Sequence, residues 1–233
     1  MVKKVKIHTT NKDFLLRLES FGIEQGYFEK KEIRNIDKTS CTSSKTEVID
    51  FDKTKEKISQ EKNFQETKSS DALKILPEHN RIDFIEFKSL KKFIANNIYD
   101  KKKNIISEKR FDNSMKKHIH NFNFSSKISD SLFILQTIIN ARNFKLKKEE
   151  KVFFEQTEKN FIILVDINLN INPIQAIAAS LDLLAQTSTR FEILIAKEFQ
   201  TLITKENSSS LHNLKSPILK SCEDIDYFYN SIT

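Results

Sequence analysis

Glycine is almost absent from this chain of 233 residues, which contains only Gly22 and Gly26. A dinucleotide-binding fingerprint or a phosphate-binding P-loop needs several glycines at fixed offsets, because its backbone N–H groups must approach the phosphates closely. Enzymes built on such loops are therefore excluded. Cysteine is equally scarce: Cys41 and Cys222 are too few for a four-thiolate zinc site, and they do not indicate the disulfide framework of a small secreted domain.

Long apolar runs are missing as well. The longest unbroken aliphatic stretch, at 161–165, is far shorter than the roughly 18 residues of a membrane-spanning helix. Residues 1–6 lack the apolar run of a signal peptide. We therefore expect a cytoplasmic protein that has no membrane among its partners.

What the chain does contain is charge and phenylalanine. Lys and Arg number 39 against 32 Asp and Glu, which gives a net charge of +7, and 19 residues are Phe. A chain of this length can bury a sizeable core, so we expect a single domain over residues 1–233. The basic balance is compatible with nucleic acid as a partner. An A/T-rich genome would also favour the codons of Lys, Asn, Ile and Phe, and the composition is compatible with both explanations.

Apolar periodicity divides the chain into strand-like and helix-like segments. Strands are predicted at 2–7, 27–33, 48–51, 73–76, 81–88, 152–154 and 161–167. Helices are predicted at 14–18, 53–60, 89–97, 125–139, 172–186, 190–204 and 217–231. This succession indicates a mixed α/β sandwich. Its parts are N-terminal strands with a polar loop (1–68), a hairpin with the following helix (69–100), a basic insertion (101–126) and helices flanking a buried strand (127–233).

The most informative motif is an acidic residue followed, one hairpin later, by Glu-x-Lys. Side chains alternate along a strand, so Glu86 and Lys88 project to one side, and Asp83 projects to the other and is taken as structural. A hairpin that closes at 77–80 would allow Asp71 to approach Glu86. Two carboxylates at a sheet edge suit Mg²⁺ or Mn²⁺, which take oxygen ligands. A lysine beside them can position water or offset the charge that develops on a phosphate.

This pattern resembles the PD-(D/E)XK superfamily, the restriction-endonuclease-like nucleases. Members carry an acidic residue on one strand and Glu/Asp-x-Lys on the next. The resemblance is carried by segments 69–73 and 82–88, and 127–132 adds to a likeness to small defence- or prophage-associated members. It implies a restriction-endonuclease-like mixed central sheet flanked by helices, and a metal-dependent endonuclease that hydrolyses phosphodiester bonds, of DNA, in defence against phage.

The same resemblance assigns roles to individual residues. Asp71 and Glu86 would be the metal ligands, with the main-chain carbonyl of Phe87 as a third. Lys88 would be the base that positions the attacking water. The glutamate that the first helix of the family often supplies has three candidates, which are Glu19, Glu47 and Glu56.

A purely structural explanation of the motif is weighed against this one. Glu-x-Lys occurs four times, beginning at Glu29, Glu66, Glu86 and Glu149. Only the third lies in a run apolar enough for a core strand and follows an acid on the preceding strand; the first is the second choice. The alternative for Glu86 and Lys88 is an exposed ion pair at a strand end. Such a pair contributes only about 0–1 kcal/mol, so stability alone gives little reason for it.

The most basic part of the chain, at 101–120, follows directly on this motif. Its lysines and arginine would hold the nucleic-acid backbone; they are Lys101, Lys102, Lys103, Lys109, Arg110, Lys116 and Lys117. Phe111, Phe122 and Phe124 offer base stacking for a single strand. A disordered loop is the other interpretation of this segment.

Two functional classes are thus compatible with the sequence. The first is a Mg²⁺-dependent nuclease. The second is a non-catalytic nucleic-acid-binding or complex-assembly subunit on the same fold, and a protein-interaction domain is a third. The residues present do not distinguish DNA from RNA as the nucleic acid. They also do not distinguish a companion protein from a homo-oligomer.

Overall fold

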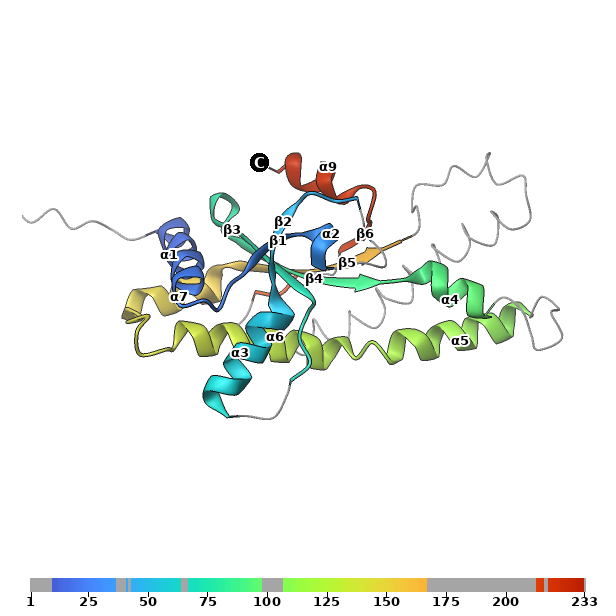
Figure 1. Cartoon of the computed structure of the whole chain (residues 1–233), viewed down its shortest axis with the longest axis horizontal. Coiled ribbons are helices and arrows are strands. Elements are labelled where there is room, and N and C mark those ends of the chain that lie inside the picture. Colours follow the sequence, from blue (N-terminus) through green and yellow to red (C-terminus); the bar gives the residue numbers. More distant parts are fainter. Residues whose placement is uncertain are drawn as a thin grey trace, which may run out of the picture.

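A computed structural model describes residues 10–36, 41, 43–63, 67–97, 107–166, 213–215 and 218–232. Within these residues six strands form one sheet in the order β1-β2-β3-β4-β5-β6 (Figure 1). They are β1 (Lys30–Glu32), β2 (Glu47–Asp50), β3 (Ala72–Leu76), β4 (Arg81–Lys88), β5 (Glu158–Val165) and β6 (Ile218–Ser221). Strands β1 to β4 pair antiparallel, and β4 to β6 pair parallel. The mixed α/β architecture predicted from the sequence is confirmed.

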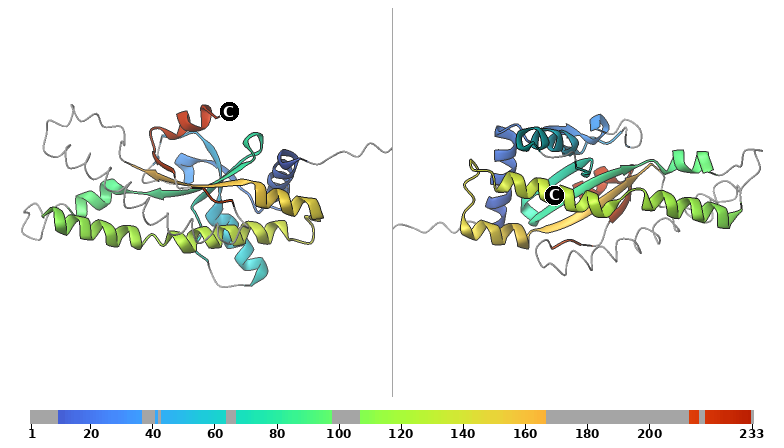
Figure 2. Two further views of the ribbon diagram at one scale, coloured as in Figure 1. Left: turned by 180° about the vertical axis from the view of Figure 1, so that it is seen from behind. Right: turned by 90° about the horizontal axis from the view of Figure 1, so that it is seen from below.

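Helices cover both faces of the sheet (Figures 1 and 2). They are α1 (Asn11–Glu24), α2 (Ile33–Ile36), α3 (Phe51–Lys62), the short 3₁₀ helix η1 (Pro77–His79), α4 (Leu90–Asn97), α5 (Glu108–His120), α6 (Phe124–Ile139), α7 (Lys148–Gln156) and α9 (Ile225–Asn230). Apolar residues of α1, α3 and α6 pack against one face, and those of α2 and α9 pack against the other. Across the described residues, no helix combines the length and apolar character that crossing a bilayer requires.

The predicted hairpin joins β3 to β4. The two strands pair from Leu76 opposite Arg81 to Ala72 opposite Ile85. Between them lies η1, which begins with a proline, and Asn80 follows it in the left-handed conformation (φ 48°). A proline that fixes φ and an Asn that tolerates positive φ are the residues that such a turn favours. This turn sets the register that brings the end of β4 beside the beginning of β3.

Strand β4 lies between β3 and β5, and each of its two faces packs against one of the two apolar cores. Phe84 belongs to the core beneath α6, whereas Ile85 belongs to the core beneath α9. Side chains alternate along the strand, so Glu86 and Lys88 share the α6 face and Phe87 lies with Ile85. The predicted parity of the motif is therefore confirmed.

Asp83 lies on the α9 face, as the alternation predicts. Arg81 donates two hydrogen bonds to its carboxylate, at 2.6 and 2.8 Å. Tyr229 of α9 and Asn160 of β5 donate one each, at 3.1 Å. The buried charge is thus paired and hydrogen-bonded, which is how a folded protein tolerates it. This cluster attaches α9 to the sheet.

Two of the predicted elements differ in type. Residues 152–154, predicted as a strand, lie in α7, where the side chain of Glu150 accepts a hydrogen bond from the N–H of Lys147 (2.8 Å) and closes the first turn. Phe154 is buried but Val152 is 46% exposed, as expected for opposite faces of a helix. Residues 218–221, predicted as helical, form β6 because pairing with the buried strand β5 outweighs local propensity.

Other predicted elements are confirmed with shifted ends, and some lie outside the described residues. The strand predicted at 27–33 is reduced to β1, and α2 begins at Ile33. The segment predicted at 161–167 is β5, whose residues are almost all buried, as a strand in the middle of a covered sheet should be. The predicted strand at 2–7 and the predicted helices at 172–186 and 190–204 lie outside the described residues.

A disulfide joins Cys41 to Cys222, which are 181 residues apart in sequence. Their number alone did not indicate this bond, and the fold brings their Cα atoms to 5.0 Å. Beside it, Asp226 of α9 accepts hydrogen bonds from the hydroxyls of Ser44 and Thr46, both at 2.6 Å. The segment before β2 and the C-terminal segment are therefore attached to each other covalently and by hydrogen bonds.

Close packing explains why a glycine occupies position 22. A Cβ built on Gly22 would lie 2.0 Å from the ring of Phe28, which is itself buried. We therefore expect Gly22→Ala to lower the free energy of unfolding by about 1–3 kcal/mol through overpacking. Urea unfolding measures the change, with Ser20→Ala on the exposed side of α1 as the matched control. A gain of stability, which alanine usually brings to a helix, would contradict this packing.

Candidate metal and phosphate site

Asp71 lies directly before β3 and is fixed by its own backbone. Its N–H donates to the carbonyl of Ile85 (3.0 Å), and its carbonyl accepts from the N–H of Phe51 at the start of α3 (3.1 Å). Its Oδ2 accepts the N–H of Phe87 at 2.7 Å. The Asp71 carboxylate is therefore held against the end of β4, with Oδ1 directed to other partners.

Glu86 is the centre of the site. Its side chain is fully buried (0% exposed) on the α6 face. The ammonium of Lys88, two residues along the strand, contacts its Oε1. A second ammonium, that of Lys127, lies 2.6 Å from Oε1 and 2.7 Å from Oε2. The ion pair of the structural alternative is therefore present at the end of β4, but its carboxylate is buried, so the expected exposure of the pair is wrong.

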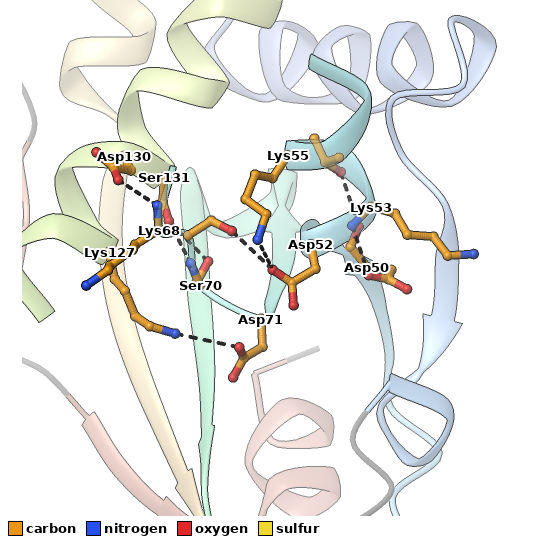
Figure 3. Close-up of polar contacts among 12 residues, drawn as sticks. Asp50, Asp52, Lys53, Lys55, Lys68, Ser70, Asp71, Lys127, Asp130 and Ser131 are labelled. Atoms are coloured by element: carbon orange, nitrogen blue, oxygen red, sulfur yellow. Dashed lines mark hydrogen bonds and ion pairs between the residues drawn. The ribbon is translucent and has the colours of Figure 1, made fainter. Parts of the chain in front are cut away.

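Lys127 connects the two carboxylates. Its Nζ, besides contacting both oxygens of Glu86, lies 3.7 Å from Oδ1 of Asp71 (Figure 3). The structure thus brings together Asp71, Glu86 and Lys88 of the predicted motif and adds Lys127 from the first turns of α6. The remaining predicted ligand is the main-chain carbonyl of Phe87. The N–H and the carbonyl of one strand residue point toward the same neighbouring strand. Because the Phe87 N–H donates a hydrogen bond to Asp71, the Phe87 carbonyl lies on that same side of β4.

The position of α6 is set by the residues that lead into β3. The N–H of Ser70 donates to the hydroxyl of Ser131 (2.9 Å), and the N–H of Lys68 donates to the carboxylate of Asp130 (2.7 Å) (Figure 3). These contacts occur one turn after Lys127, so they hold its side chain over Asp71. Segment 67–71 and α6 together therefore fix the position of Lys127 relative to Asp71.

Sequence reasoning did not assign a role to Lys127. A usable signal is nevertheless present: Lys127, Asp130 and Ser131 follow the i, i+3, i+4 spacing of one helix face, beside the buried stripe of α6. Three polar residues at the edge of an apolar stripe indicate a face that contacts something polar. What the spacing could not supply is the partner, because Lys127 lies 41 residues beyond Glu86 in the chain.

The electrostatics of the cluster are nearly balanced. Burial and the neighbouring charge of Glu86 raise the pKa of Asp71 to about 6, against the opposing effects of Lys127 and of the Phe87 N–H. Burial acts to lower the pKa of Lys127, but Glu86 and Asp71 outweigh it and the pKa is raised. With all four side chains ionised, two negative and two positive charges share one partly enclosed space.

The donor set suits a hard divalent cation. Carboxylate oxygens of Asp71 and Glu86 converge on one point, because the same ammonium contacts both. Oxygen ligands are those that Mg²⁺ prefers, and Mg²⁺ is commonly bound by only one or two carboxylates and several waters. Among the described residues no group of three or more His, Cys, Asp or Glu side chains is placed to hold a metal. A cation at this site would therefore depend on two carboxylates and main-chain oxygen.

The candidate first-helix glutamates are elsewhere. Glu19 of α1 and Glu47 of β2 pair with Lys30, at 2.9 and 3.5 Å, and Glu56 is exposed on α3. The acidic residue of α3 that acts on the site is Asp52 in its first turn. It accepts a hydrogen bond from Ser69 (3.4 Å), and its charge contributes to the raised pKa of Lys127 (Figure 3).

The basic segment is helical where it is described. Of the predicted phosphate-binding residues, four are exposed on α5, namely Lys109, Arg110, Lys116 and Lys117. Lys101, Lys102 and Lys103 lie outside the described residues. The interpretation as a disordered loop is therefore wrong for 108–120.

The aromatic residues near α5 are part of the core. Phe122 and Phe124 are only 8% and 4% exposed, so neither offers a free face for base stacking. His118 stacks on the ring of Phe93 with centroids 4.4 Å apart, and the Nζ of Lys88 lies 4.8 Å from the Phe122 centroid. This packing attaches the C-terminal end of the basic helix α5 next to Lys88.

Comparisons of this chain with family models, with curated proteins and with solved structures find no match.

Proposed function

We propose that this chain is a metal-dependent nuclease on a restriction-endonuclease-like fold, which hydrolyses phosphodiester bonds of DNA. The observation that supports it is the convergence of Asp71, Glu86 and Lys88 at one end of two neighbouring strands. Asp71, Glu86 and the carbonyl of Phe87 would hold Mg²⁺ or Mn²⁺. When bound, such an ion polarises the phosphoryl group and lowers the pKa of the water it binds.

The lysines of the site have their own part in this proposal. Lys88 and Lys127 present two ammonium groups beside the carboxylates, and their side chains are 19% and 17% exposed. Lys88 orients the attacking water, and its charge offsets the charge that develops on the phosphate. Fixing these groups before substrate arrives is what makes such stabilisation effective, because little reorganisation is then needed.

The exposed basic face of α5 would hold the nucleic-acid backbone. Helix α5 is the next described helix after α4, and its C-terminal end lies beside Phe122, whose ring Lys88 contacts. Binding of this kind weakens with added salt, because each phosphate contact releases counterions. The resemblance to small defence-associated nucleases extends the proposal to a role in defence against phage.

A second function is favoured by one observation, the charge balance of the cluster. Glu86 and Asp71 already have two ammonium partners, so the site is also suited to a non-catalytic nucleic-acid-binding or assembly subunit that has no metal. The two functions are distinguished by calorimetric titration with Mn²⁺. Heat of binding that is lost in Asp71→Asn supports the nuclease, whereas intact DNA binding without Mn²⁺ heat supports the subunit.

Asp71→Asn is the sharpest test of the nuclease, because it removes a charge and keeps the shape. The amide oxygen of Asn can still accept the Phe87 N–H, so the fold is retained. We expect cleavage of plasmid and single-stranded DNA with Mg²⁺ or Mn²⁺ to fall by about 100-fold or more. Asp13→Asn at the exposed N-terminal turn of α1 is the matched control. Equal cleavage by wild type and Asp71→Asn would contradict the assignment.

The same variant is expected to be more stable than wild type at neutral pH. The pKa of Asp71 is raised from 3.8 to about 6, so between these values the folded protein binds a proton that the unfolded chain has released. The stability of wild type therefore falls as the pH rises through this window. Asp71→Asn avoids that loss and should gain up to about 3 kcal/mol at pH 7–8 in EDTA.

Urea unfolding at two pH values checks this expectation. The gain should be nearly absent at pH 3, where Asp71 is protonated in the folded protein and mostly so in the unfolded chain. A variant that is more stable but inactive indicates that the wild-type charge serves function and not folding. A loss of stability at pH 7 would show that the ionised carboxylate stabilises the fold.

A further inference from the structure

The position of Lys127 carries an inference about how the site binds its ligands. Its Nζ lies within 2.6 and 2.7 Å of the two oxygens of Glu86 and 3.7 Å from Oδ1 of Asp71. These oxygens are the ones that a divalent cation would need. An ammonium and a divalent cation cannot share one set of oxygens without strong repulsion, which a partly buried site screens poorly.

The charge count leads to the same point. Two carboxylates and two ammonium groups sum to no net charge, so a divalent cation added beside them would leave the site with two uncompensated positive charges. A polyanion that reaches the two ammonium groups, whose side chains are 19% and 17% exposed, would remove this excess. Metal and phosphate therefore each improve the site for the other.

Of the two lysines, Lys127 is better placed than Lys88 to move its ammonium group away from the carboxylates. Lys88 extends from the same strand as Glu86 and lies against the ring of Phe122, 4.8 Å from its centroid. Lys127 comes from the opposing helix, and its long side chain ends between the carboxylates without a contact to an aromatic ring among the described residues. Rotation about its own side-chain bonds would move its charge while α6 stays fixed through Ser131 and Asp130.

We propose that Lys127 is an internal counter-cation of the site: a divalent cation binds Asp71 and Glu86 as Lys127 leaves them, and a nucleic-acid phosphate receives its ammonium. The inference rests on the proposed function and adds to it that metal and nucleic acid bind cooperatively. By linkage, the factor by which DNA tightens the metal equals the factor by which the metal tightens DNA.

The test measures metal affinity, independently of cleavage. Mn²⁺ is titrated calorimetrically into the full chain, alone and with a DNA duplex of phosphorothioate linkages. We expect Lys127→Met without DNA to bind Mn²⁺ about tenfold more tightly than wild type, and the duplex to tighten Mn²⁺ about tenfold in wild type but much less in the variant. Lys148→Met, an exposed charge change on α7, should behave as wild type.

A second variant guards against an effect on folding. Lys127→Gln keeps a hydrogen-bond donor for Glu86 and should shift Mn²⁺ affinity in the same direction. Circular dichroism of each variant shows whether the fold is kept. Equal or weaker Mn²⁺ binding by both folded variants would overturn the inference while leaving the nuclease proposal to the Asp71→Asn assay. Mn²⁺ binding by none of the proteins would overturn both.

Discussion

Replacing Cys222 with serine is expected to lower the free energy of unfolding by up to about 5 kcal/mol. The disulfide to Cys41 closes a loop of 181 residues, and the chain-entropy description of cross-links assigns about 5 kcal/mol to a loop of that size. The bond restricts the unfolded chain by connecting its C-terminal segment to the residues before β2. In the folded protein that connection is supported by Asp226, which accepts the hydroxyls of Ser44 and Thr46.

Urea unfolding with and without dithiothreitol measures this effect. Wild type without reductant should unfold at a higher urea concentration than Cys222→Ser, and the difference should disappear when both are reduced. Cys41→Ser is the matched control, because it breaks the same bond from the other side and should give the same loss. Equal unfolding of wild type with and without reductant would contradict a stabilising disulfide.

The local pattern of the sequence was sufficient to predict the hairpin and the parity of β4. Alternation along the strand fixes which residues share a face, so Glu86 and Lys88 had to project together. The breaker residues between β3 and β4 limited the turn to a few positions, which placed Asp71 near the end of β4. Strand alternation and the position of the turn depend on residues close together in the chain, so a single sequence is enough to predict them.

Contacts between segments far apart in the chain were not predictable in the same way. The spacing of Lys127, Asp130 and Ser131 shows a polar helix face but not that it meets segment 67–71. The pairing of β6 with β5 reversed a helical prediction because a hydrogen-bonded neighbour outweighs propensity in so short a segment. Likewise, the buried state of Glu86 depends on α6 and not on the strand's own sequence.

The two acids of the site are expected to differ in what their charges do for folding. Glu86→Ala leaves the ammonium groups of Lys88 and Lys127 without their shared partner in a site where water screens little. Removing one member of a buried ion cluster costs about 3–5 kcal/mol, because the remaining charges stay buried and unpaired. We therefore expect Glu86→Ala to lose stability in urea unfolding at pH 7 in EDTA, where Asp71→Asn gains it.

A double-mutant cycle separates this loss from a simple packing defect. If unpaired ammonium groups are the cause, Lys127→Met should be much less harmful in Glu86→Ala than in wild type, and the double variant should be more stable than the sum of the single losses predicts. A cavity left by the shorter side chain would instead give additive losses. In that case the charge of Glu86 stabilises the folded protein, whereas the charge of Asp71 lowers its stability. Such an asymmetry is expected where one carboxylate belongs to the scaffold as well as to the site, and the other is kept ionised for a ligand.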